Sequence, residues 1–389
     1  MSVAGSRPVL IYCHPSMNKL AESIITDVAA KSAGADKRYR NVELKSADIR
    51  WKHFPDGWPN LFIDNVKQCA GKDVIFIGSF HSQQVIFDQL SIIYAFPRYL
   101  AHSFTLILPY FPTGTMERVD TEGQIATARV SEHTRLPSCE HTRLPSCETL
   151  SKMLSSIPLT ARGPAQIVIY DIHALQERFY FSDNVIPRLE TAIPLLQRRI
   201  GQLPDHDKVS IAFPDQGAFK RFHLLFANFP TITCSKLRDG DKRIVTVTEG
   251  SAEDRHVVIV DDLVMTGGTL MECAKALKAR GANTISAFVT HAVFPNQSWR
   301  RFTAAATAEA VVNGEAEAVV NDEVEAVVND GARAVVNGDA EDAHQPLLKH
   351  FWITDSIPTV ADYSSVKPFE LLSLSSVITT ALLSYDLQQ

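Results

Sequence analysis

The stretch VVIVDDLVMTGGTL, residues 257–270, decides the fold of this chain. Its apolar first half predicts a buried β-strand that ends in two adjacent carboxylates, Asp261 and Asp262. A Thr-Gly-Gly-Thr turn follows, and the pattern from Leu270 to Arg280 predicts a helix. A strand, a glycine-containing turn and a helix N-terminus in direct succession form one βα unit of a parallel sheet.

The residue types in this unit suit a phosphorylated sugar. Paired carboxylates accept hydrogen bonds from neighbouring hydroxyls, while glycines let backbone N–H groups approach a phosphate that the helix dipole also favours. An acidic strand end alone fits a purely structural interpretation, and the turn at a fixed distance favours ligand binding. The candidate binding residues are Asp261, Asp262, Thr266, Gly267, Gly268 and Thr269.

Length and charge restrict the classes of protein to which the chain can belong. Its 389 residues predict two domains, each able to bury a core. The formal net charge of −6 argues against broad binding to nucleic acid or to a membrane surface. No apolar run reaches transmembrane length, and the first residues lack secretory or transit-peptide features. We therefore expect a cytosolic protein without nucleic-acid or membrane partners.

The cysteines are scattered along the chain and form no CxxC pair, so neither a zinc site nor a thioredoxin-like motif is expected. Free thiols in a reducing compartment are the expected state. The six positions are Cys13, Cys69, Cys139, Cys147, Cys234 and Cys273.

Apolar strand patterns alternate with helical patterns along the whole chain, which predicts an α/β fold with mainly parallel sheets. The expected strands are Val9–Tyr12, Asp73–Ile77, Thr105–Leu108, Gln166–Tyr170, Val209–Phe213, His256–Val260, Thr284–Val289 and Phe351–Thr354. The expected helices include Gln84–Arg98, Asn184–Arg199 and Gly268–Arg280. Because Pro and Gly gather at residues 158–164, we place the domain boundary there, giving domains 1–160 and 161–389.

Two segments do not fit this alternation. Residues 132–139 and 140–147 are both EHTRLPSC, a tandem duplication within an insertion at 130–148 that interrupts an expected helix. Residues 310–341 hold four AVVN-based units within a low-complexity insertion at 304–345. These units are too short and too poor in large apolar residues to build a solenoid, so we expect surface loops, which cost little closure entropy.

Two further strand ends carry candidate metal ligands. His173 follows the strand that ends at Tyr170, and an imidazole there can bind a metal or a phosphate oxygen. Asp215 follows Phe213, and its oxygen atoms suit Mg²⁺. A structural histidine and a helix N-cap are the alternative interpretations, and the cap is compatible with metal binding.

A basic stretch, SKLRDGDKR at residues 235–243, lies between two expected strands. Lys236 and Arg238 alternate, so an extended hairpin places them on one side, where they can neutralise charge on a transferring phosphate group. An ordinary solvated hairpin is the alternative. Two weaker signals are the aromatic turn with Phe54 and Asp56, which suits a nucleobase, and the loop 111–118 with Arg118, which suits a phosphate.

Together these segments resemble the ribose-phosphate pyrophosphokinases, the phosphoribosyl pyrophosphate (PRPP) synthetases. VVIVDDLVMTGGTL is similar to the PRPP-binding loop of that family, and YDIHALQERFYF, AFPDQGAFKRF, SKLRDGDKRIV and HFWITDS are similar to its other blocks. The segment at residues 78–119 resembles the plant-type class that works without phosphate activation. The resemblance implies two tandem type I phosphoribosyltransferase-like domains, and an enzyme that makes PRPP and AMP from ATP and ribose 5-phosphate.

The resemblance also implies roles for the candidate residues, with a homo-oligomer and other synthetase isoforms as expected partners. It assigns ribose 5-phosphate to Asp261, Asp262 and residues 266–269, and transition-state charge to Lys236 and Arg238. It assigns Mg²⁺ to His173 and Asp215, and ATP to Phe54, Asp56 and Arg118, across a subunit boundary.

The better-known class of the family carries acids at the positions of Met265 and Trp58, and the absence of these acids from this chain fits the plant-type class.

Two alternative functions stay open at this stage. A PRPP-using phosphoribosyltransferase shares the 261–269 loop, although it usually needs only one such domain. A non-catalytic regulatory homologue is the second alternative, although such a protein is expected to lose the charged site residues that are present here.

Overall fold

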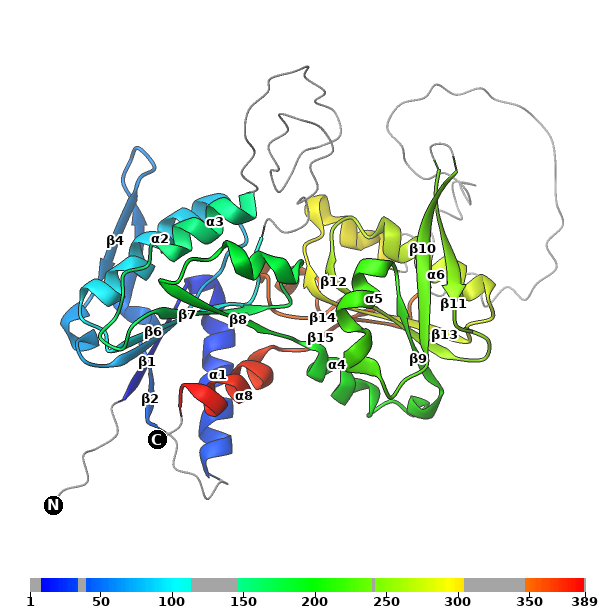
Figure 1. The fold of residues 1–389 in the computed structure, drawn as a ribbon, viewed down its shortest axis with the longest axis horizontal. Coiled ribbons are helices and arrows are strands. Elements are labelled where there is room, and N and C mark those ends of the chain that lie inside the picture. Colours follow the sequence, from blue (N-terminus) through cyan, green and yellow to red (C-terminus); the bar gives the residue numbers. More distant parts are fainter. Residues whose placement is uncertain (1–7, 34–39, 113–145, 240–241, 304–346, 388–389) are drawn as a thin grey trace.

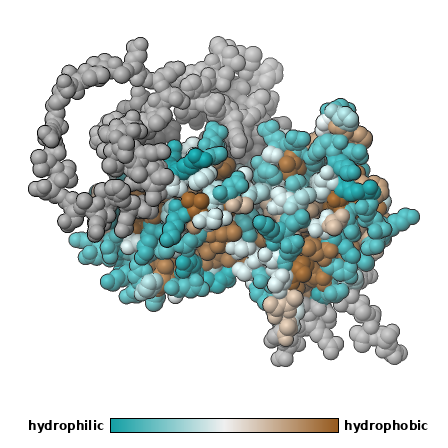
Figure 2. Space-filling view, turned by 180° about the vertical axis from the view of Figure 1, so that it is seen from behind, coloured by the Kyte–Doolittle hydropathy of each residue, from teal (hydrophilic) through white to brown (hydrophobic). Residues whose placement is uncertain are grey.

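A computed structural model of the chain describes residues 8–33, 40–112, 146–239, 242–303 and 347–387. Its strands form two mainly parallel sheets that lie side by side, with helices on their faces (Figure 1). No helix within these ranges combines the length and apolar character that crossing a bilayer requires. On the face turned away in Figure 1, apolar residues gather in separate patches among hydrophilic ones (Figure 2).

The first sheet has six strands in the order β2-β1-β5-β6-β7-β8, all parallel. Its strands are β1 (Val9–Cys13), β2 (Val42–Leu44), β5 (Asp73–Ile77), β6 (Ser103–Leu108), β7 (Ala165–Tyr170) and β8 (Val185–Glu190). A separate antiparallel hairpin consists of β3 (Ile49–His53) and β4 (Pro59–Ile63).

The second sheet has seven strands in the order β11-β10-β9-β12-β13-β14-β15, and only the β10–β11 pair is antiparallel. Its strands are β9 (Val209–Phe213), β10 (Thr231–Asp239), β11 (Lys242–Glu249), β12 (His256–Val264), β13 (Thr284–Ala292), β14 (His350–Ile353) and β15 (Phe369–Leu371).

The α-helices connect and cover these strands. They are α1 (Asn18–Ala33), α2 (Gln83–Arg98), α3 (Ser146–Ser155), α4 (Ile193–Ile200), α5 (Gln216–Phe222), α6 (Gly268–Ala279) and α8 (Ser375–Tyr385). Short 3-10 helices include η1 (Pro15–Met17), η2 (Ser46–Asp48), η3 (Val66–Cys69), η5 (Leu175–Tyr180), η6 (His206–Lys208), η7 (His223–Phe226), η8 (Pro295–Phe302) and η10 (Pro358–Asp362).

One apolar core runs through both halves of the molecule. It includes Ile11 of β1, Leu196 of α4, Val258 of β12 and Leu382 of α8, all almost completely buried. The last helix, α8, packs against α1 of the first half, and Lys31 donates a hydrogen bond to the Thr380 hydroxyl at 2.9 Å. The end of the chain therefore returns to the first sheet and joins the two halves.

The sequence predicts the α/β class, the parallel sheets and the eight strand positions, to within a few residues at most ends. The predicted helix Asn184–Arg199 is wrong, because Val185–Glu190 is edge strand β8 and only Ile193–Ile200 is helical. The boundary between the sheets lies after β8, and not between residues 160 and 161, because β7 and β8 extend the first sheet.

The duplicated EHTRLPSC segment lies outside the described residues up to position 145, as does the whole AVVN insertion at 304–345. Residues 146–148, which we assigned to the first insertion, belong to α3. The cysteines among the described residues are free thiols, as expected; Cys139 lies outside those residues.

Candidate functional site

The site lies where the strand order of the second sheet reverses. The chain leaves β9 for β10 on one side and returns as β12 on the other side of β9. In open α/β sheets, the carboxyl ends of the strands at such a reversal border the crevice that binds ligands, and here these are the ends of β9 and β12. Asp215 follows β9, and Asp261 and Asp262 lie near the end of β12, so the topology brings these three acids to one place.

Strand β12 is longer than the sequence predicts and runs through the acidic pair to Val264. The extension pairs with β13, with Asp261 opposite Val289 and Val264 opposite Ala292. The acids are thereby held in a fixed extended backbone, and Asp262 is only 5% exposed. The expectation that the strand ends at Val260 is wrong because β13 offers partners for three further residues, Asp261, Leu263 and Val264.

The two acids ionise differently. Burial and the neighbouring Asp262 carboxylate raise the pKa of Asp261 well above its usual range, and the charge of Asp215 adds to that effect. Burial alone would also raise the pKa of Asp262, but the hydrogen bond with His173 and the charge of that imidazole lower it to about 2. The surroundings therefore favour the protonated form of Asp261 and the ionised form of Asp262.

The Thr-Gly-Gly-Thr turn links β12 to α6, as predicted. Gly267 has a φ of +82° and is the N-cap of α6, so its backbone adopts a conformation that favours glycine. A Cβ atom there would lie 2.5 Å from the ring of Phe302. The turn thus places small residues at the N-terminus of a helix of 12 residues, a position that attracts phosphate.

His173 lies in the loop that follows the first sheet's strand β7, but its side chain reaches the second sheet. It follows β7, and its Nδ1 lies 2.7 Å from Oδ2 of Asp262 on β12. The hydrogen bond with Asp262 raises the pKa of the imidazole, outweighing burial. The structure therefore joins a predicted metal ligand to a predicted sugar ligand, a contact that no local sequence pattern predicts.

The two sheets are also connected by three residues to which the sequence analysis assigned no role: Asp171, Thr290 and His291. Asp171 is 2% exposed, and its Oδ2 accepts hydrogen bonds from the Thr290 hydroxyl of β13 at 2.7 Å and from the Ala192 N–H at 2.9 Å. The buried His291 of β13 donates through Nε2 to the carbonyl of Tyr170, 3.1 Å away. Asp171 and His291 each follow an expected strand, and that position was the available signal, which the sequence interpretation missed.

Asp215 is a helix N-cap, the alternative that the sequence left open. Its Oδ1 accepts a hydrogen bond from the Ala218 N–H at 3.0 Å, at the start of α5. The negative charge of Asp215 also helps to raise the pKa of the Asp261 carboxyl group. The cap fixes the carboxylate at the crevice without excluding a second role for it.

The predicted hairpin with Lys236 and Arg238 is present. Lys236 pairs with Val245 and Arg238 with Arg243 across the antiparallel strands β10 and β11 (Figure 1). The structure describes the backbone at these two positions and not their side chains. Arg118 lies outside the described residues.

Phe54 and Asp56 lie in the turn between β3 and β4. Asp56 Oδ1 accepts a hydrogen bond from the Trp58 N–H at 3.2 Å, and the Phe54 side chain is half exposed. The hairpin extends from the outer side of the first half of the molecule, away from the second sheet that contains β12 (Figure 1). Within one chain, these two residues are therefore not brought to His173 and Asp262.

The acids and the histidine fit Mg²⁺ only in a particular way. Among the described residues, no group of three or more His, Cys, Asp or Glu side chains is arranged to hold a metal ion. Mg²⁺ commonly binds through one or two carboxylates while phosphates and water complete its shell. Asp215 and the Asp261–Asp262 pair provide such carboxylates, so they fit a hydrated ion that arrives with a phosphate ligand.

Comparison with known proteins agrees with this geometry. The family model "N-terminal domain of ribose phosphate pyrophosphokinase" matches residues 9–134, and "Phosphoribosyl transferase domain" matches residues 231–304. The chain is 46% identical to ribose-phosphate pyrophosphokinase 4 of Oryza sativa subsp. japonica over 96% of its own length and 94% of that protein. This chain belongs to the ribose-phosphate pyrophosphokinase family.

Further relatives support the same membership. Ribose-phosphate pyrophosphokinase 3, chloroplastic, of Arabidopsis thaliana is 47% identical over 88% of this chain and 70% of that protein. The crystal structure of a phosphoribosylpyrophosphate synthetase from Mycobacterium smegmatis superposes with a TM-score of 0.64 at 17% identity, covering 97% of this chain and 98% of the other. The expected fold, two tandem phosphoribosyltransferase-like domains, is confirmed. The expected enzyme class, a ribose-phosphate diphosphokinase, is also confirmed.

Proposed function

We propose that the His173–Asp262 crevice is where this pyrophosphokinase transfers diphosphate from ATP to ribose 5-phosphate. The supporting observation is the 2.7 Å contact that joins His173, in the loop after β7, to the Asp262 carboxylate of the second sheet. The 1-hydroxyl of the ribose attacks the β-phosphorus of ATP. The bond from that phosphorus to the α-phosphate oxygen breaks, AMP leaves, and the hydroxyl proton is released to solvent.

The second sheet holds the sugar in this proposal. The backbone N–H groups of residues 266–269 bind the 5-phosphate at the N-terminus of α6. Asp262, whose pKa is lowered to about 2, accepts hydrogen bonds from a ribose hydroxyl, and Asp261 lies beside it on β12 as a second ligand for the sugar hydroxyls. Ligand binding at this edge orients the 1-hydroxyl, and orientation accounts for much of the catalysis of phosphate transfer.

The donor side combines charges from several elements. Asp215 would hold Mg²⁺, with His173 joining it only when its imidazole is neutral, and the ion would supply neutralisation of phosphate charge when it is bound. Lys236 and Arg238 on the β10–β11 hairpin neutralise charge that develops on the transferring group. ATP would contact Phe54, Asp56 and Arg118.

A second copy of the chain supplies the nucleotide contacts in this proposal, so the enzyme is a homo-oligomer. The support is an exposed aromatic surface on the β3–β4 hairpin and the adjacent α2, where a partner would cover apolar area. Phe54, Trp58, Phe62 and Phe87 are 50%, 62%, 55% and 47% exposed, and the rings of Trp58 and Phe87 lie 5.9 Å apart. Light scattering of the wild type and of a Trp58→Ser variant tests the assembly, and a monomeric wild type would contradict it. Assembly with other isoforms and a cytosolic location stay predictions.

The decisive experiment measures AMP and PRPP formation from ATP, Mg²⁺ and ribose 5-phosphate. We expect equal activity with and without inorganic phosphate, and none in an Asp261→Asn/Asp262→Asn double variant. Release of AMP only in the presence of all three components supports the proposal. A folded wild-type protein that forms no AMP would favour the regulatory homologue, and a base-dependent release of pyrophosphate from PRPP would favour the phosphoribosyltransferase.

A further inference from the structure

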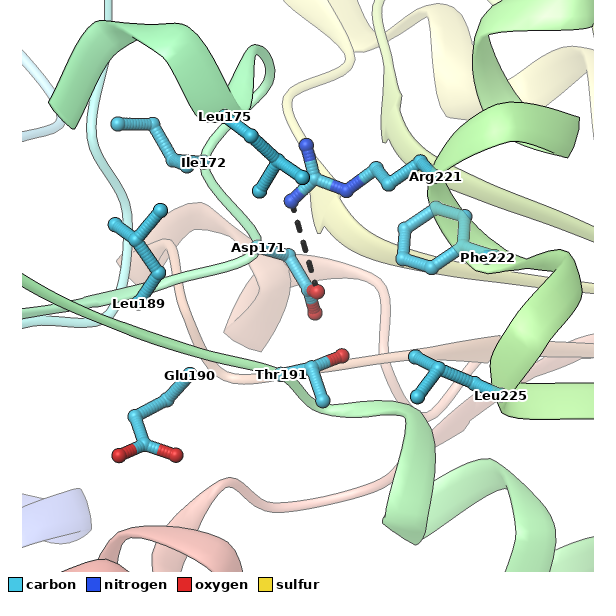
Figure 3. Close-up of a pocket in the computed structure, with 9 residues that line it drawn as sticks. All are labelled: Asp171, Ile172, Leu175, Leu189, Glu190, Thr191, Arg221, Phe222 and Leu225. Carbon is cyan, nitrogen blue, oxygen red and sulfur yellow. Dashed lines mark ion pairs between the residues drawn. The ribbon is translucent and has the colours of Figure 1, made fainter. Parts of the chain in front are cut away.

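Arg221 of α5 crosses from the second half of the molecule to the loop that carries His173. Its Nη1 donates a hydrogen bond to the backbone carbonyl of His173 at 2.8 Å, and its Nη2 lies 3.7 Å from Oδ1 of Asp171. The Arg221 side chain is only 11% exposed, and Figure 3 shows its guanidinium group directed at the Asp171 carboxylate. One side chain therefore contacts both ends of the short segment 171–173.

Asp171 is a fixed point for this segment. Its Oδ2 is occupied by the Thr290 hydroxyl and the Ala192 N–H, so only Oδ1 faces Arg221. Its backbone has a φ of +39°, a conformation that non-glycine residues seldom adopt without support. The His173 end of the segment is looser, since the His173 side chain is 44% exposed.

The two acceptors suit a guanidinium group better than an ammonium group. Arg presents several N–H donors in a rigid planar fork, and Lys presents a single charged nitrogen on a flexible stem. The carbonyl of His173 and the carboxylate of Asp171 are approached by different nitrogens of the same fork. The positive charge of Arg221 also acts on the His173–Asp262 pair, because it helps to lower the pKa of Asp262.

We infer that Arg221 is a positioning residue, which holds the loop after β7 so that the His173 imidazole stays against Asp262. It does this by donating to the His173 carbonyl while it is anchored on the buried Asp171. The inference rests on the proposed function for its effect on turnover. Its structural part, the placement of His173, stands on the contacts alone.

A pocket of about 180 Å³ beside Arg221 provides a specific test. Apolar side chains line much of it, and Arg221 and Asp171 are its charged pair (Figure 3). In an Arg221→Ala variant, the space left by the side chain joins this pocket, so a free guanidinium ion can enter and restore the lost donors. The residues lining the pocket are Asp171, Ile172, Leu175, Leu189, Glu190, Thr191, Arg221, Phe222 and Leu225.

The experiment compares wild type, Arg221→Ala, Arg221→Lys and the matched control Arg280→Ala, an exposed arginine at the far end of α6. We expect kcat to fall about 100-fold in Arg221→Ala and less in Arg221→Lys, because a misplacement of about 1 Å within an active site has effects of that size. The KM for ribose 5-phosphate should stay within about twofold, since the phosphate loop lies on α6. Millimolar guanidinium chloride, against sodium chloride at equal ionic strength, should restore turnover in Arg221→Ala only.

A second readout does not depend on activity. With isotope-labelled histidine at a fixed pH, the Nδ1 resonance of His173, assigned by its loss in His173→Gln, should shift in Arg221→Ala and stay unchanged in Arg280→Ala. Arg221→Ala turnover within about twofold of wild type, or an unshifted His173 resonance with no guanidinium rescue, would overturn the inference. If the wild type itself forms no PRPP, the proposed function fails, and the resonance alone decides whether Arg221 holds His173.

Discussion

Nδ1 of His173 lies 2.7 Å from Oδ2 of Asp262, although His173 follows a strand of the first sheet, Asp262 lies in a strand of the second, and 89 residues separate them. The pair connects the two halves of the molecule, with the imidazole partly exposed and the carboxylate buried. The hydrogen bond raises the pKa of the histidine, and it helps to lower that of the aspartate to about 2. The contact is therefore an ion pair at pH values where the His173 imidazole is protonated and the Asp262 carboxyl group is ionised.

The first prediction concerns the pH dependence of stability. Because the pKa of His173 is raised in the folded state, the contribution of the pair is fully present below the ordinary histidine pKa of about 6.5. It is lost as the pH rises through the raised value, and at the acid end as the pH falls through the Asp262 pKa of about 2. His173→Gln should therefore lower the free energy of unfolding most at about pH 5–6, and the loss should shrink at alkaline pH.

Urea unfolding of the Mg²⁺-free protein across this pH range measures the effect. His206→Gln is the control, because His206 is an exposed histidine on η6, at the amino end of strand β9 and so away from the carboxyl ends that carry the site. A loss in His173→Gln that is independent of pH would show that the two groups do not form a charged pair.

The second prediction separates the two glycines of the phosphate loop. Gly267→Ala places a Cβ at a φ of +82° and within 2.5 Å of the Phe302 ring, so we expect a loss of about 2 kcal/mol or more in unfolding free energy. Gly268→Ala meets its nearest neighbour only at 4.0 Å, and its stability should stay within about 0.5 kcal/mol of wild type. Thermal unfolding of both variants checks this, and equal stabilities would contradict the described turn.

The third prediction divides the two roles of Asp215. Asparagine caps a helix about as well as aspartate, so Asp215→Asn should keep its stability, whereas Asp215→Ala should lose about 1 kcal/mol. Both variants should lose turnover, and both should need more Mg²⁺ for half-maximal activity, if the carboxylate also holds the ion. Wild-type turnover in Asp215→Asn would leave only the capping role.

The sequence allows the fold and the edge that carries the site to be predicted, because parallel strands place their carboxyl ends together. Asp215, Asp261 and Asp262 meet at the strand-order reversal for that reason. The contact of Asp262 with His173 has a different origin. It depends on how the two sheets meet through Asp171 and residues 290–291, and no local pattern encodes that arrangement.

The failed helix at residues 184–199 has an equally physical cause. Its apolar residues recur at helical spacing across the strand β8 and the helix α4, so one continuous period conceals two elements. Pro187 within β8 was the opposing signal, since proline is tolerated in a strand at the edge of a sheet. The apolar positions are Ile186, Leu189, Ile193, Leu196 and Ile200.

The last prediction concerns Lys236, whose position on β10 is described and whose side chain is not. If the ammonium group neutralises charge that develops during diphosphate transfer, its contribution exists mainly in the transition state. Lys236→Ala should then lower kcat by a factor that corresponds to about 2.7–4 kcal/mol, the size found for loss of one preorganised donor. The KM for ribose 5-phosphate should change little, because that substrate binds at α6.

Steady-state kinetics with each substrate varied in turn measure this division. Lys242→Ala is the matched control, because Lys242 lies on the neighbouring strand β11 of the same hairpin. If Lys236→Ala weakens substrate binding as much as it slows turnover, the ammonium group already contacts the ground state. The hairpin would then be part of the substrate-binding surface, and the charge that stabilises the transition state would have to come from Arg238 or from the metal ion.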